Sequence, residues 1–439
     1  MKGELHDAEV RPPVAVLFGR AGRTGGEDVL DELAGLAEAA DVGVAGRLVQ
    51  SLQRPLSATY IGSGKVEELR DLVKACHAEL VLADVDLSPA QARNLTKAVG
   101  VRVVDRSELI MDIFARRART AQAKLQVELA QLKYMLPRLR GQWVHLDRYR
   151  GGGVGTRGPG EKQLETDRRL VNKRIGDLQA RLEVYERRTQ LNLAGRSSAR
   201  KVALAGYTNT GKSTLFNRLT GADRLAVNRL FATLDTRTRK WPVPGCEELI
   251  LSDTVGFVAS LPHHLVASFH ATLEEVVEAD LVLHIVDASG PHVRESMEAV
   301  MTTLKDIGAA DIETLCVFNK VDLIADTMEL QALLNAHPGA VVISARTGQG
   351  LEDLSSRVAA FFVSQTQVFQ ITIPIERGRA LALAGELGEL ISSDADTQCV
   401  RVCLRVEESR IARLKAWAAS EGLLLEPARI EDGAANSGD

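Results

Sequence analysis

The sequence lacks the features that would anchor the chain in a membrane or direct it out of the cell. No apolar run in its 439 residues approaches the roughly 20 needed to cross a bilayer. The first 13 residues carry acidic side chains and no apolar stretch, unlike a secretory signal, and no lipid-anchor motif is present. We therefore expect a cytoplasmic protein, with peripheral association with a membrane left open.

Cysteine is also scarce, and its distribution excludes a disulfide framework. The five cysteines are scattered along the chain and form no CxxC pair. Cysteines with this distribution are typical of reduced, structural thiols in an intracellular protein. We predict that none of the five forms a disulfide.

What the chain does contain is the composition of a globular protein. Hydrophobic residues make up 45% and charged residues 26% of it, and its length predicts about two to four domains. The total charge of −4 hides an asymmetry, because residues 106–200 contain 21 Lys/Arg and 10 Asp/Glu. This block carries +11 and leaves −15 on the rest, which indicates one surface specialised for a polyanion.

The hydrophobic pattern predicts an α/β fold in four parts. Residues 1–105 alternate short apolar strands with amphipathic helices, as in a small parallel α/β domain, and contain no complete phosphate loop. Residues 106–200 are basic and helical, residues 201–365 form a second α/β domain, and residues 366–439 form a small α/β domain with a disordered tail. In order, the last part predicts strand 368–373, helix 379–390, strand 399–406 and helix 409–419.

Two apolar stripes in the basic part predict a helical hairpin. Their residues recur at spacings of three and four, as on the seam of a coiled coil, and a glycine-rich segment separates them. The simplest interpretation is an antiparallel pair of helices joined by a long loop, with two surface helices of a globular domain as the alternative. The stripes are Leu125, Leu129, Leu132 and Leu136, and Val171, Ile175, Leu178, Leu182 and Tyr185.

The firmest motif is a phosphate loop that follows an apolar strand at residues 202–205 and precedes a helix. Its sequence, GYTNTGKS, has glycines that let backbone N–H groups turn toward phosphates, next to the positive end of a helix. Lys212 is placed to reach the β- and γ-phosphates, and the Ser213 hydroxyl to bind Mg²⁺. The residues assigned to nucleotide binding here are Gly206, Tyr207, Thr208, Asn209, Thr210, Gly211, Lys212, Ser213 and Thr214.

Three further motifs predict which nucleotide binds. Asp253 ends an apolar strand and precedes Gly256, an arrangement that suits a carboxylate near Mg²⁺ and a mobile sensor of the γ-phosphate. The carboxylate of Asp322 can accept from the guanine N1–H and 2-amino groups, whereas adenine offers no matching donors. We therefore predict GTP and GDP as ligands. The residues assigned are Asp253, Thr254, Val255, Gly256, Asn319, Lys320, Val321 and Asp322, with Ser344, Ala345 and Arg346 near the guanine O6.

A switch segment is predicted between the phosphate loop and Asp253. Thr233 is our candidate for the threonine that closes over Mg²⁺ and the γ-phosphate, with Thr236 and Thr238 as alternatives. The segment adds Phe231, Ala232, Thr233, Leu234 and Asp235 to the nucleotide site, and Ser213 and Thr233 are the predicted metal ligands. Phe257 occupies the position at which many GTPases have a water-orienting glutamine, so we expect slow intrinsic hydrolysis or help from another group.

Taken together, these motifs resemble the HflX family of ribosome-associated GTPases. The resemblance is carried by the stretch GGGVGTRGPGEKQLETDRR at 151–169, GYTNTGKST at 206–214, FATLDT at 231–236, DTVGF at 253–257 and LPHHLV at 261–266. The order of the four parts is also similar, so the likeness covers most of the chain and is weakest before residue 10 and beyond about residue 365.

The resemblance implies a partner, the large ribosomal subunit and its RNA, and a function, the splitting of stalled ribosomes after stress. The glycine-rich loop fits this partner, since cations can meet phosphates and glycines allow close approach to folded RNA. A disordered loop with solvated arginines is the alternative. The predicted RNA contacts are Arg148, Arg150, Gly151, Gly152, Gly153 and Arg157.

Related GTPases also indicate the cofactors and the catalytic residues. Mg²⁺ is the first cofactor, and K⁺ is a second candidate, because an asparagine at the place of Asn209 can help hold that ion in related GTPases. The alternative role of Asn209 is to stabilise the loop. The catalytic candidates are therefore Lys212, Thr233 and Asn209, in a chain that we expect to be monomeric.

Two other classes of function compete with ribosome splitting. One is an RNA-binding or assembly factor that GTP gates without any splitting activity. The other is an RNA-modifying or membrane-trafficking GTPase, which is disfavoured because no cysteine is a clear catalytic candidate and no lipid anchor is present.

Overall fold

The computed structural model divides the chain into two compact units, residues 1–241 with 248–351, and residues 242–247 with 352–439. It describes residues 11–21, 30–51, 54–142, 159–194, 199–222, 230–231, 237–244, 246, 249–257, 275–324 and 327–428. Among the helices in these ranges, none is long and apolar enough to span a membrane. All five cysteines lie in these ranges and none forms a disulfide, as predicted.

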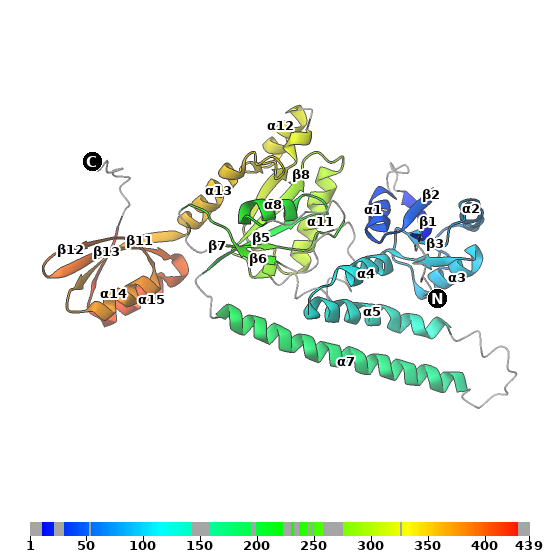
Figure 1. Cartoon of the computed structure of the whole chain (residues 1–439), viewed down its shortest axis with the longest axis horizontal. Helices are drawn as coiled ribbons and strands as arrows, with labels where there is room; N and C mark the ends of the chain where they lie inside the picture. Colours follow the sequence, from blue (N-terminus) through cyan, green and yellow to red (C-terminus); the bar gives the residue numbers. More distant parts are fainter. Residues whose placement is uncertain are drawn as a thin grey trace, which may run out of the picture. The chain divides into compact units, whose positions relative to one another are not determined.

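The N-terminal domain is a parallel sheet with helices on both faces, as the alternating pattern predicted (Figure 1). The strand order is β2-β1-β3-β4, and every pair is parallel. Apolar residues of α1, α4 and the following helix α5 (Ala121–Gln142) pack on one face, and those of α2 and α3 on the other. The elements are β1 (Val14–Ala21), α1 (Asp31–Ala39), β2 (Gly43–Ser51), α2 (Ser63–Ala75), β3 (Leu80–Ala83), α3 (Pro89–Val99), β4 (Arg102–Val104) and α4 (Arg106–Arg117).

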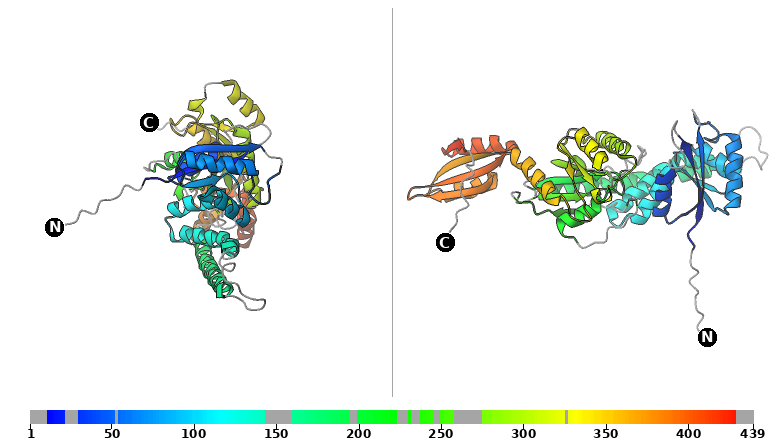
Figure 2. Two further views of the ribbon diagram at one scale, coloured as in Figure 1. Left: turned by 90° about the vertical axis from the view of Figure 1, so that its right-hand side faces the viewer. Right: turned by 90° about the horizontal axis from the view of Figure 1, so that it is seen from above.

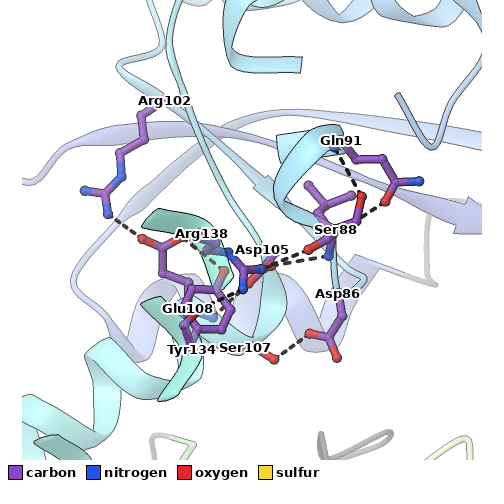
Figure 3. Close-up of polar contacts among 10 residues, drawn as sticks. Asp86, Ser88, Gln91, Arg102, Asp105, Ser107, Glu108, Tyr134 and Arg138 are labelled. Carbon is purple, nitrogen blue, oxygen red and sulfur yellow. Dashed lines mark hydrogen bonds and ion pairs between the residues drawn. The ribbon is translucent and has the colours of Figure 1, made fainter. Parts of the chain in front are cut away.

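Asp105 joins the sheet of this domain to the helical hairpin (Figure 3). Its carboxylate caps α4 by accepting from the Glu108 N–H at 2.9 Å, and it also accepts from Arg138 of α5 at 2.8 Å. The Arg138 guanidinium lies 3.3 Å from the Tyr134 ring centroid and donates to the Leu87 carbonyl. Because the Asp105 side chain is only 1% exposed, burial raises its pKa, against the opposing effects of the Glu108 N–H, the Tyr134 hydroxyl and the Arg138 charge.

The two apolar stripes do form a hairpin of antiparallel helices, α5 (Ala121–Gln142) and α7 (Pro159–Ala194) (Figure 1). Leu129 packs against Leu178 and Leu182, and Arg174 donates two hydrogen bonds to Glu128 across the pair. With 36 residues, α7 is about 54 Å long, since a helix rises 1.5 Å per residue. The hairpin is therefore confirmed as a feature of the fold.

The GTPase domain is built on a six-stranded sheet of order β10-β9-β8-β5-β7-β6. All its pairs are parallel except β6 with β7. The central strand β5 leads directly into the phosphate loop, and the neighbouring strands β7, β8 and β9 end at the same edge. The elements are β5 (Arg200–Gly206), α8 (Lys212–Thr220), β6 (Arg237–Lys240), β7 (Leu249–Asp253), β8 (Leu281–Asp287), α11 (Val293–Asp306), β9 (Thr314–Asn319), η2 (Val321–Leu323), α12 (Thr327–Ala336) and β10 (Val341–Val342).

The C-terminal unit contains a four-stranded antiparallel sheet of order β12-β13-β11-β14 with two helices on one face (Figure 2, right). Its chain order, β-α-β-β-α-β, is that of a split βαβ unit. The prediction of a helix to residue 390 was wrong at its end, because Gly388 is extended and the chain continues as strand β12. The elements are α13 (Leu351–Ser364), β11 (Thr366–Pro374), α14 (Gly378–Leu387), β12 (Glu389–Ala395), β13 (Cys399–Glu407), α15 (Glu408–Ser420) and β14 (Leu424–Pro427).

Candidate functional site

The phosphate loop connects β5 to α8 with the backbone geometry that its glycines permit. Gly211 has a φ of +94°, and a Cβ atom there would lie 2.4 Å from the Asn319 Nδ2 atom. A Cβ atom on Gly206 would lie 2.3 Å from the Ile285 carbonyl oxygen. Both positions therefore require glycine, because any side chain would collide with the neighbouring strands. Asn209 is also left-handed, with a φ of +61°, a conformation that asparagine tolerates better than most residues.

Lys212 is oriented by the loop that it belongs to. Its ammonium donates to the Gly206 carbonyl at 2.9 Å and to the Tyr207 carbonyl at 2.7 Å. An ammonium group has three N–H donors, so one remains for a phosphate oxygen. Burial lowers the pKa of Lys212 to about 8, against the opposing effect of the Asp253 charge. A buried ammonium without a full set of partners fits an anionic ligand that supplies the missing acceptor.

The segment after β7 lies beside this loop. Asp253 is fully buried at the strand end, and register pairs it with Leu204 of β5. Thr254 is also buried, and its hydroxyl donates to the Leu204 carbonyl at 2.6 Å. The backbone of Phe257 exchanges hydrogen bonds with the loop, and its side chain, 2% exposed, packs in the core of the domain. Phe257 therefore has neither the chemistry nor the position to orient an attacking water.

Two residues near the phosphate loop carry oxygen donors that suit Mg²⁺. Ser213 is the second residue of α8, and Asp253 is the last residue of β7, which pairs with β5. In the part of the chain that the structure describes, no group of three His, Cys, Asp or Glu side chains could hold a metal. Mg²⁺ in nucleotide sites takes few protein ligands and several oxygens from phosphates and water, so the oxygens of Ser213 and Asp253 suit such a site.

The guanine end of the predicted site is organised around Asp322. Its carboxylate accepts from the Ser344 hydroxyl at 2.6 Å and pairs with Arg346 at 2.7 Å. The Ser344 hydrogen bond, followed by the Arg346 charge, holds the pKa of Asp322 below its ordinary value. A carboxylate oriented by these two partners could accept from the guanine N1–H and 2-amino groups.

Asn319 and Lys320 support this end of the site from within the protein. The Asn319 amide donates to the Thr210 carbonyl at 2.7 Å and accepts from the Ala345 N–H at 2.9 Å. It thereby ties the phosphate loop to the segment that follows β10. Lys320 is the N-cap residue that precedes η2, the short helix that contains Val321 and Asp322, and it pairs with Asp287 at 2.6 Å.

The N-terminal domain packs against the nucleotide site, which the sequence did not predict. Phe231, 2% exposed, stacks edge-on against Phe114 of α4 with ring centroids 4.7 Å apart. Val255 joins the same core, and Leu230 and Tyr207 pack against it. The Tyr207 hydroxyl also donates to Glu32 of α1, a residue without any motif around it.

Several predicted residues lie outside the part of the chain that the structure describes. These are Ala232, Thr233, Leu234 and Asp235 of the switch segment, with the alternative Thr236, and all the predicted RNA contacts at Arg148, Arg150, Gly151, Gly152, Gly153 and Arg157. Their roles stay predictions. The alternative Thr238 is described in β6, where its hydroxyl lies 3.3 Å from the Ser252 hydroxyl and 3.2 Å from the Glu275 carboxylate.

Comparison with known proteins finds matches along most of the chain. Family models described as GTP-binding GTPase N-terminal, GTP-binding GTPase Middle Region and 50S ribosome-binding GTPase match residues 27–115, 117–196 and 201–320. A protein named GTPase HflX from Caldanaerobacter subterraneus subsp. tengcongensis is 43% identical over 378 residues, 86% of this chain and 87% of that protein. A protein of the same name from Escherichia coli is 44% identical over 353 residues, 80% of this chain and 83% of that protein.

Solved structures show a weaker likeness. A GTP-binding protein from Sulfolobus solfataricus in complex with GDP is 23% identical, with a TM-score of 0.43 over 79% of this chain and 98% of that chain. The sequence relatives, which match at higher identity over most of both chains, are therefore the stronger comparison.

Proposed function

The chain belongs to the HflX family of GTPases, and on this premise we propose that it binds the large ribosomal subunit and separates the subunits of stalled or stress-damaged ribosomes. The observation that carries the proposal is the pairing of an intact GTP site with a long basic hairpin in one chain. The name of the matching family model, 50S ribosome-binding GTPase, supports the same partner.

The enzyme hydrolyses GTP to GDP and phosphate, and we assign roles to the residues of the site. Lys212 contacts the β- and γ-phosphates, and Asp322 selects guanine. The Ser213 and Thr233 hydroxyls, with the Asp253 carboxylate nearby, would hold Mg²⁺, which would offset the charge of the phosphates. Asn209, whose own backbone is left-handed, stabilises the loop, and it is the residue that would help hold K⁺. Because Phe257 is buried and cannot orient water, the site depends on the ribosome to reach a high rate of GTP hydrolysis.

The hairpin supplies the proposed contact with ribosomal RNA. Its helix α5 is held to the N-terminal domain by the bonds of Arg138 to Asp105 and to the Leu87 carbonyl. A rigid base would carry the glycine-rich loop at residues 151–160 into a folded RNA cavity, where the flanking arginines meet phosphates. GTP would favour binding, and hydrolysis would release the factor, because the two nucleotide states differ in their contacts.

Ribosomes are expected to stimulate the enzyme. We predict that GTP turnover in potassium buffer rises about tenfold or more when purified large subunits are added, a lower bound to what a partner supplies to other slow GTPases. Sucrose gradients of intact ribosomes with the factor and a non-hydrolysable GTP analogue test splitting directly. Free subunits support the proposal, whereas intact ribosomes carrying bound factor favour the assembly-factor alternative. Absence of stimulation contradicts the coupling between the two activities.

Deleting residues 151–160 should separate the two activities. We predict that the variant binds GTP with unchanged affinity and loses both ribosome stimulation and splitting, because the loop and the GTP site are on different elements. Replacing the same residues by a glycine-serine linker of equal length is the matched control for chain connectivity, and it should also be inactive on ribosomes. Equal loss of GTP binding would contradict this division of roles.

A further inference from the structure

The Tyr207 side chain connects the phosphate loop to the N-terminal domain. Tyr207 is the second residue of the loop, and its hydroxyl donates a hydrogen bond to the Glu32 carboxylate on α1. The two residues are 175 positions apart in the sequence. Its ring also packs against the shared apolar core of α1, α4 and α5, so the side chain lies against the N-terminal domain.

Glu32 is fixed in turn by a buried arginine. Arg106 donates one N–H to the second oxygen of Glu32 and another to Asp84 at 2.6 Å. The Arg106 side chain is only 6% exposed, and those of Glu32 and Asp84 are 22% and 17% exposed. A guanidinium held between two carboxylates has little freedom, because losing either partner would leave a charge buried without compensation. Burial also raises the pKa of Asp84 to about 6, against the effect of Arg106.

The backbone of Tyr207 carries this constraint to the catalytic lysine. Its carbonyl accepts from the Lys212 ammonium at 2.7 Å and from the Thr210 hydroxyl at 3.0 Å. The direction of the remaining Lys212 donor therefore depends on where the Tyr207 peptide lies. A displacement of the Tyr207 ring would move the same peptide, since side chain and carbonyl share one residue.

We propose that Glu32 is a positioning residue of the GTP site, which acts through Tyr207 and is held in place by Arg106. The N-terminal domain thus preorganises the phosphate loop before the nucleotide arrives, which lowers the ordering cost of binding. This inference rests on GTP binding and hydrolysis, and it does not depend on the proposed action on ribosomes.

The test compares nucleotide affinity among variants of the full-length chain. We expect Tyr207→Phe to raise the Kd for a fluorescent GDP analogue and for GTP about five- to tenfold, the effect of one charge-assisted hydrogen bond. Glu32→Ala should raise it to a similar extent, and Glu32→Gln should restore part of the affinity, because its amide oxygen can still accept from the tyrosine. The loss should fall mainly on KM rather than on kcat.

Glu38 provides the matched control. It lies on the same helix and lines the cavity of about 450 Å³ beside the loop, and its side chain forms no hydrogen bond with the other described residues. Glu38→Ala should therefore leave the Kd unchanged. The double variant Tyr207→Phe/Glu32→Ala should be no weaker than either single variant, because both remove the same bond.

Two results would overturn the inference. One is an unchanged Kd for Tyr207→Phe, a variant that keeps the aromatic ring and the pair of Arg106 with Glu32. The other is additive loss in the double variant, which would mean that the two residues act separately. Thermal unfolding without nucleotide identifies any variant that fails to fold, and Tyr207→Phe then decides the question alone. Ribosomes are absent from these assays, so their outcome is independent of the splitting experiment.

Discussion

The Asp322→Asn variant is expected to bind GTP about a hundredfold more weakly than the natural chain, or worse. Ser344 and Arg346 orient the Asp322 carboxylate, so both of its oxygens are ready to accept from the guanine N1–H and 2-amino groups. An asparagine directs N–H donors at the same donors of the base, and sites built for a hydrogen bond reject a mismatched partner strongly, by up to about 10⁴-fold. Calorimetric titration with GDP and GTP measures the loss.

The same substitution should create affinity for xanthosine nucleotides. Xanthine has a carbonyl oxygen where guanine has the 2-amino group, and the asparagine N–H can donate to it. The expected outcome is therefore a reversal of preference, with XDP bound more tightly than GDP. Asp311→Asn, the same substitution at an exposed residue, is the control and should leave both affinities unaltered. If Asp322→Asn bound GDP normally, Asp322 would not be the residue that reads the base.

The Lys212→Ala variant is expected to hydrolyse GTP with a kcat/KM about a thousandfold lower. Removing one preorganised hydrogen-bond donor to a reacting oxyanion reduces the rate by up to about this factor. The lysine is nearly completely buried, and two loop carbonyls aim its third donor into the site. Alanine removes the only charge that the loop itself carries. Single-turnover assays with radiolabelled GTP measure the rate.

Lys201→Ala is the control for this experiment. Lys201 is the second residue of strand β5, at the end away from the loop, and its side chain forms a partly exposed ion pair with Glu278 at 2.9 Å. Its removal should leave the rate within about twofold, because a partly exposed ion pair contributes little. The Lys212→Ala variant should also fail to split ribosomes in the gradient assay. Normal turnover by Lys212→Ala would contradict the assignment of the phosphate contact.

Local sequence patterns predicted helices and strands well where hydrophobic periodicity was clear. The N-terminal strands and helices follow the predicted order, because each apolar run is bounded by clear turns. The hairpin was also recognisable, since apolar residues recur every three or four positions along each of its two helices. They are Leu125, Leu129 and Leu132 on α5, and Ile175, Leu178 and Leu182 on α7. Strand β12 was missed because the apolar pattern of α14 continues through Leu390, while Gly388 ends the helix before it.

The chemistry of the GTP site could be predicted from local sequence. A phosphate loop binds through contiguous backbone N–H groups, and the predicted base contact lies in one short segment around Asp322, so both can be recognised in neighbouring residues. How the N-terminal domain meets that site depends instead on the folded structure. Glu32, Arg106 and Phe114 are ordinary residues of amphipathic helices in the sequence, and folding alone brings them against Tyr207 and Phe231. Contacts between residues far apart in the chain leave no periodicity or motif, because each partner satisfies the pattern of its own helix or loop.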